Sequence, residues 1–168
     1  MTGRGQSGEP ARDRDPGGRA RNARLRDELG RPLSRSAPGG VPPSPDEPAL
    51  PPASALALAQ QLIDRGQPFR AHEVLEASWK AAPPAERDLW QGLAQVAVGL
   101  THARRGNAQG AVALLRRGAD AISGYAEACP HGINAAGIAL AAGELADDIE
   151  QGGLAAVPPA RLLIRLAR

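Results

Sequence analysis

The sequence predicts an all-α protein, a compact helical bundle or array of about five to six helices with a disordered N-terminal tail. Two observations predict this division. Residues 1–52 hold ten of the 16 prolines and eight of the 20 glycines and show no apolar periodicity, so they cannot bury enough apolar surface to offset their ordering entropy. Residues 53–168 are rich in Ala, Leu and Val at helical spacing, and no segment alternates convincingly at period two. We therefore expect one all-helical domain over residues 53–168.

Each expected helix rests on periodicity together with a start or stop signal. Gly66 and Gly106 are typical of helix ends, Pro68 suits a first turn, and Asn107 suits a capping position. The expected helices cover residues 54–65, 68–81, 84–105, 108–125, 134–150 and 159–167. Because the connections between them are short, consecutive helices should pack as antiparallel neighbours.

Charge and composition exclude several classes of protein. From residue 53 onward eleven basic residues balance eleven acidic ones, and no Lys/Arg stripe carries interleaved aromatics, so we expect no nucleic-acid partner. No apolar run reaches the ~18 residues of a membrane span, and no apolar segment of a secretory signal follows Met1. The single cysteine, Cys129, fits a reducing compartment. We expect a cytoplasmic protein, and nothing in the sequence requires a cofactor.

The third expected helix carries polar side chains within an otherwise apolar sequence. On a wheel of about 100° per residue, Gln91, Gln95 and His102 share one face, opposite an apolar face that includes Leu93 and Leu100. A helix that is apolar nearly all round is usually central, so these side chains should form an internal polar stripe. Its two glycines, Gly92 and Gly99, each cost about 1 kcal/mol of helix propensity relative to Ala, which close packing of a neighbouring helix would offset.

The second expected helix supplies the complementary groups. His72 and Glu76 are i, i+4 neighbours, with Trp79 close by, while Glu73 points further away. If the second and third helices pack antiparallel, His72 and Glu76 should meet Gln95 or His102 between them. An imidazole, carboxylates and carboxamides would then share one pocket.

Three interpretations of this pocket stay open. It could be a structural network in which Glu accepts from Gln and His and fixes helix register. It could bind a metal through His72, Glu76 and His102, although the H-E-x-x-E run lacks the second histidine of the metalloprotease H-E-x-x-H motif, so we assign no metal ligands. It could also perform acid–base catalysis or bind a polar ligand through Glu76 and His72. Of the four aromatic residues, three flank the stripe, and core packing is the simpler role for them than pocket walls.

These motifs resemble one known family. The order F-x-x-H-E-x-x-E-x-x-W, then Q-G-L-x-Q, then His102 and G-N-x-x-G-A, is similar to family 309 of domains of unknown function, over about residues 62–115. The resemblance implies a small all-helical domain with no established activity. Ser78, Trp90 and Ala94 depart from the family pattern at positions that concern packing more than the polar set. The signature positions carried over are His72, Glu73, Glu76, Trp79, Gln91, Gly92, Gln95, His102, Gly106, Asn107 and Gly110.

The function predicted from these residues is an uncharacterised cytoplasmic helical module. It would bind a polar small ligand or a protein partner at a His/Glu/Gln pocket, without chemistry. The alternative is a hydrolase-like enzyme, metal-assisted or not, with Glu76 as base. The Ala/Gly-rich runs 135–137 and 141–143 have little polar cover, which predicts a homodimer. A monomer in which the last two helices cap the core is the other reading of the same surface.

Overall fold

The computed structural model describes residues 26–27, 30–33 and 49–167. Over those residues it contains helices and no β-strand, which confirms the predicted all-α fold class. The predicted disordered tail, residues 1–52, lies largely outside the described residues. The α-helices are α1 (Pro52–Asp64), α2 (Pro68–Ala81), α3 (Arg87–Arg104), α4 (Ala108–Ser123) and α5 (Ala135–Gly152). Short 3-10 helices are η1 (Pro84–Glu86), η2 (Pro130–Gly132), η3 (Leu154–Ala156) and η4 (Pro159–Leu162).

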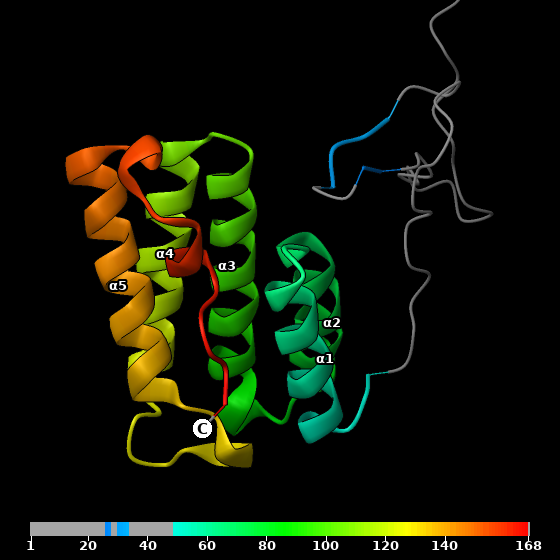
Figure 1. Cartoon of the computed structure of the whole chain (residues 1–168). Coiled ribbons are helices and arrows are strands. Elements are labelled where there is room, and N and C mark those ends of the chain that lie inside the picture. The colour runs from blue at the N-terminus through cyan, green and yellow to red at the C-terminus, as the bar shows by residue number, and fades with distance from the viewer. Residues whose placement is uncertain (1–25, 28–29, 34–48, 168) are drawn as a thin grey trace, which may run out of the picture.

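Consecutive helices pack on one another in chain order. Figure 1 shows α3, α4 and α5 side by side, with the α1–α2 pair on the other flank of α3. Helix α3 is the central element, and eleven of its 18 residues are buried. Its large side chains Trp90, Leu93 and Leu100 are almost wholly inside the core. The predicted central position of this helix is therefore confirmed.

The helix boundaries follow from local chemistry that the sequence displays. Pro68 stands at the first helical position of α2, where its missing N–H costs nothing. Gly106 has a φ of 79°, a left-handed conformation that suits glycine and turns the chain from α3 into α4. Asn107 then caps α4, since its side-chain oxygen accepts a hydrogen bond from the Gly110 N–H at 2.9 Å. Asn134 caps α5 in the same way, through the Gly137 N–H at 3.3 Å.

Helices α3 and α4 approach so closely that side chains are excluded at their crossing. A Cβ added at Gly92 would lie 2.8 Å from Ile122, and one added at Gly99 would lie 2.8 Å from Leu115. On the α4 side, a Cβ at Gly118 would lie 2.8 Å from the carbonyl oxygen of Gly92. The contact is therefore backbone against backbone, as the glycines of α3 predicted, and Gly118 completes it.

The structure corrects the sequence prediction at the sixth helix. Residues 159–167 do not form an amphipathic helix, because only the 3-10 turn η4 is helical and the chain then runs extended. Ile164 and Leu166 are buried while Leu163 and Arg165 are exposed, which is period-two burial. The Leu166 N–H donates to Gln60 Oε1 of α1 at 2.8 Å, and the Leu166 carbonyl accepts from the Asn134 N–H at 3.2 Å. Partners that are distant in sequence thus supply the hydrogen bonds that a helix would have made internally.

The third predicted helix also begins later than expected. Residues 84–86 form η1, and α3 starts at Arg87. Among the described residues, no helix combines the length and apolarity needed to cross a membrane.

Candidate functional site

Helix α2 presents a row of polar and aromatic side chains along one flank. His72 Nε2 lies 3.8 Å from Glu76 Oε2, and Glu76 Oε1 lies 3.2 Å from Lys80 Nζ. The ring of Phe69 stands one turn before His72, with 6.0 Å between the two ring centroids. The i, i+4 spacing read from the sequence therefore produces the expected His72–Glu76 pair, and Lys80 extends it by one turn.

The surroundings of His72 favour its neutral form. Burial lowers the pKa of His72 below its ordinary value, the Glu76 carboxylate opposes this, and Lys80 adds to it. Its Nδ1 atom is buried and has no hydrogen-bond partner. A buried polar atom without a partner costs about 1–3 kcal/mol, so His72 is a destabilising choice for a purely structural position.

His102 lies in the last turn of α3 and contacts the cap of α4. Its Nδ1 lies 2.7 Å from Asn107 Nδ2, and the Asn107 side-chain oxygen accepts from Gly110. A Cβ at Gly110 would lie 2.7 Å from His102 Nδ1, which explains the small residue there. Burial, and then the charge of Arg105, lower the pKa of His102. His102, Asn107 and Gly110 thus form one interlocked cap.

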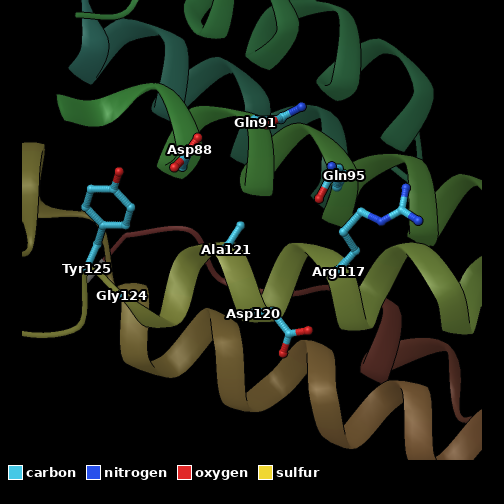
Figure 2. Close-up of a pocket in the computed structure, with 8 residues that line it drawn as sticks. All are labelled: Asp88, Gln91, Gln95, Arg117, Asp120, Ala121, Gly124 and Tyr125. Atoms are coloured by element: carbon cyan, nitrogen blue, oxygen red, sulfur yellow. The ribbon is translucent and has the colours of Figure 1, made fainter. Parts of the chain in front are cut away.

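A groove of about 740 Å³ runs between α3 and α4 (Figure 2). Gln91 and Gln95 line it from α3, together with Asp88. Arg117 lines it from α4 and rises toward α3 beside Gln95, while Asp120 points to the other side of α4. The groove is lined by Asp88, Gln91, Gln95, Arg117, Asp120, Ala121, Gly124 and Tyr125. It is open to solvent, so the predicted internal stripe is in fact half-buried.

Gln95 is the most informative residue of the groove. Its side-chain oxygen is buried and has no hydrogen-bond partner. A guanidinium, a carboxylate and a second carboxamide are available nearby from Arg117, Asp88 and Gln91. An unpaired buried acceptor beside an open, polar groove can be satisfied by a donor that a ligand brings.

The residues predicted as one pocket lie in three settings. His72 and Glu76 are on the flank of α2, and Gln91 and Gln95 are in the α3–α4 groove. His102 is in the last turn of α3, against the cap of α4. Glu73 is half-buried on α2, and Trp79 packs against the core. That the pocket candidates act together stays a prediction.

The metal interpretation can be compared with the side-chain positions. No three His, Cys, Asp or Glu side chains of the described residues lie close enough together to hold an ion. His72, Glu76 and His102 therefore do not form such a group.

Several residues around these sites escaped sequence reasoning. Arg105, at the end of α3, lies over the start of α2, with its Cζ 5.8 Å from the Phe69 ring centroid. The Tyr125 hydroxyl donates to the Ala85 carbonyl at 3.0 Å, which holds one end of the groove. The sequence carries no signal for Arg117, because an adjacent pair of arginines on an amphipathic helix is typical of solvated surface.

A loop after α4 docks on η1 and was also missed. His131 Nε2 lies 2.7 Å from Glu86 Oε2, and the Trp90 indole N–H donates to the same carboxylate oxygen at 3.2 Å. The hydrogen bond with His131 is the main reason that the pKa of Glu86 is lowered. Cys129 and His131 both have positive φ, which shows that the loop adopts a constrained path to make this contact.

The fold and these residues define a class, a small all-helical protein with half-buried polar side chains on its central helix. Residues 56–114 match the family described as "Domain of unknown function (DUF309)", which confirms the resemblance seen in the motifs. The segment reaches from α1 into α4 and contains all the predicted site residues.

One curated relative is similar over a shorter stretch. "Uncharacterized protein YpuF" of Bacillus subtilis (strain 168) is 48% identical over 48 residues, which is 28% of this chain. The match spans 28% of the length of that relative. No solved structure matches the chain. Neither description states an activity.

Proposed function

We propose that this chain is a cytoplasmic binding module that takes a polar small ligand in the α3–α4 groove. The single observation that carries the proposal is Gln95, whose buried side-chain oxygen lacks a partner at the wall of an open groove. A folded protein keeps such a group at a cost of about 1–3 kcal/mol unless something completes it. A ligand N–H donor would complete it.

The groove also suggests the chemical class of the ligand. The Arg117 side chain rises from α4 toward α3 beside Gln95, so its guanidinium can hold an anionic group of a ligand whose N–H donates to Gln95. Asp88 and Gln91 add an acceptor and a second carboxamide along α3. The lining therefore suits a small zwitterionic or amide-bearing molecule with a carboxylate or phosphate.

The test is a thermal-shift and calorimetry screen of amino acids, dipeptides and nucleobase phosphates on wild type and on Gln95→Met. We expect Gln95→Met to raise the melting temperature of the free protein, because it removes the unpaired amide, and to abolish ligand binding. Gln109→Ala is the control, since Gln109 is an exposed glutamine of α4 outside the groove lining. If Gln95→Met lowers the melting temperature and no compound shifts wild type, Gln95 fixes helix packing and the proposal fails.

The alternative predicted function, a hydrolase-like enzyme with Glu76 as base, rests on a different observation. His72 keeps a buried, unpartnered Nδ1 one turn from the Glu76 carboxylate. An ester or amide substrate cleaved by wild type but not by Glu76→Gln would favour it over binding alone. Glu73→Gln is the matched control, as the neighbouring carboxylate of the same helix.

A homodimer is the partner we propose for the outer face of α5. Leu140 is 64% exposed there, although Ala135 and Ala142 of the Ala/Gly-rich runs are buried in the core. Because Leu140 is the main apolar side chain of this face, Leu140→Gln should remove the contact, and it is compared with wild type. Light scattering at micromolar concentration should give twice 17.4 kDa for wild type and 17.4 kDa for the variant. A wild-type mass of 17.4 kDa that does not change with dilution rejects the dimer.

A further inference from the structure

A short turn from the N-terminal part of the chain closes on itself with several hydrogen bonds. The Asp27 N–H donates to the Arg31 carbonyl at 2.9 Å, and the Arg31 N–H donates to the Asp27 carboxylate at 2.7 Å. The Gly30 N–H donates to the Asp27 carbonyl at 2.8 Å, and Arg26 pairs with Pro32 in an isolated antiparallel bridge. We call the described residues 26–27 and 30–33 the docking turn.

The docking turn is seated on the ring of Phe69, at the start of α2. Gly30 is buried, and a Cβ added to it would lie 2.3 Å from a carbon of the Phe69 ring. The Arg26 guanidinium lies over the same ring, with its Cζ 5.5 Å from the centroid. Arg26 Nη1 donates to the Gly30 carbonyl at 2.8 Å, which fixes the guanidinium in this position. Glycine is required at the seat because any side chain would enter the ring.

Arg105, the residue that follows α3, approaches Phe69 as well, which connects the docking turn to both helices. Its Cζ lies 5.8 Å from the ring centroid, so two guanidinium groups share one aromatic ring. Burial is the main reason that the pKa of Arg105 is lowered; the Asp27 carboxylate opposes this, whereas Arg31 and Arg26 add to it. Asp27 is thus the acid that offsets a concentration of arginines at this end of the α2–α3 pair.

We infer that the docking turn is an intramolecular ligand of the helical domain, bound in cis to the surface formed by Phe69 and Arg105. The occupant is this chain's own segment, because its glycine, its arginine and its acid each match one feature of that surface. The covered surface adjoins His72, whose ring centroid is 6.0 Å from that of Phe69. Release of the turn would therefore open the His72 end of the α2 flank. The inference is independent of the ligand proposed for the α3–α4 groove.

Nuclear magnetic resonance on the full chain tests this inference. In wild type, the ring current of Phe69 should move the Gly30 Hα resonances away from their unstructured positions, and the Arg31 amide should be protected from exchange. In Phe69→Leu both signatures should vanish, with the Arg31 amide exchanging about tenfold faster as two exposed cation–π contacts are lost. Unstructured Gly30 shifts and an unprotected Arg31 amide in wild type would overturn the inference.

Two further variants test the same contact without changing Phe69, in case Phe69→Leu disturbs folding. Gly30→Ala should expel the turn through its clash with Phe69 while leaving the amide resonances of α5, which is remote from the contact, unchanged. Gly153→Ala is the matched control, because Gly153 also has a φ of 73° but has nothing within 4 Å of an added Cβ. It should leave the Gly30 signature in place. Arg31 protection that disappears on dilution would show docking on a second copy and would overturn the cis assignment.

Discussion

A Gly→Ala substitution should lower the stability of the protein at the crossing of α3 and α4 and raise it at an open helical position. Gly118→Ala places a methyl group 2.8 Å from the Gly92 carbonyl oxygen, 3.1 Å from the Val96 nitrogen and 2.7 Å from Val96 Cγ2. Two of these three atoms are backbone, so no rotamer change relieves the contact and the helices must move apart. Overpacking of this kind costs about 1–3 kcal/mol. Ala gains about 0.8–1.0 kcal/mol over Gly in a helix interior, which leaves a net loss of up to about 2 kcal/mol.

Gly143→Ala is the matched comparison. Gly143 lies in the interior of α5, and a Cβ added there meets nothing within 4 Å. Only the helix-propensity gain remains, so this variant should be more stable than wild type by up to about 1 kcal/mol. Because the helix-propensity gain is common to both, the two Gly→Ala variants should differ in free energy of unfolding by the overpacking cost, about 1–3 kcal/mol.

Urea denaturation followed by circular dichroism at the helical band measures both variants against wild type. Equal slopes would show that the extent of unfolding is unchanged, so that the midpoints report stability. If Gly118→Ala is as stable as Gly143→Ala, the two helices are not in backbone contact. The account of the crossing given above would then be wrong.

Two more predictions concern the cap and the buried imidazole. Asn107→Ala should lower the free energy of unfolding by about 1 kcal/mol in urea, because the Gly110 N–H and His102 Nδ1 both lose their partner, and an unchanged midpoint would contradict the cap. The pKa of His72 is lower in the folded state than its ordinary value of 6.5, so folding favours the neutral imidazole. This contribution to the stability of the folded state is therefore fully present above pH 6.5. It decreases as the pH falls through 6.5 toward the folded-state pKa, because the unfolded chain then binds a proton that folded His72 does not. Denaturation midpoints between pH 8 and pH 5 should therefore fall more steeply for wild type than for His72→Gln, and parallel curves would contradict the burial of His72.

The helices could be predicted because their signals are local. Helix α2 begins and ends where the sequence indicates, with Pro68 in its first turn and two prolines behind it. Asn107 and Gly106 likewise place the start of α4 from adjacent residues alone. The start of α3 was missed by three residues, because Pro84 is equally compatible with the first turn of an α-helix and with a 3-10 turn.

The last segment could not be predicted because its structure depends on distant partners. Leu162 and Leu166 are four residues apart, which fits a helix as well as the observed extended chain. What decides between them is Gln60, which bonds to the backbone of Ile164 and Leu166. No local pattern contains that information.

The candidate site was only partly readable for the same reason. The i, i+4 pair of His72 and Glu76, and the shared face of Gln91 and Gln95, follow from helical periodicity. The neighbours that give them their chemistry, Arg117 beside Gln95 and Arg105 beside Phe69, come from other helices. Gln91 and Gln95 are half-buried rather than fully buried because of the angle at which α4 packs on α3. The glycines at the crossing determine that angle, and helical periodicity alone does not show it.

The extended segment after η4 has a consequence for the order in which the molecule is completed. Gln60 forms hydrogen bonds with backbone groups that lie 104 and 106 positions further along the chain. During synthesis on a ribosome α1 is made early, yet the hydrogen bonds of its Gln60 side chain can form only after residue 166 has emerged. Closing so long a loop adds little to the free-energy cost, since each doubling of loop length costs only about 0.6 kcal/mol. Its effect is on timing, because α1 precedes the other described α-helices yet gains its last partner only after all of them have been synthesised.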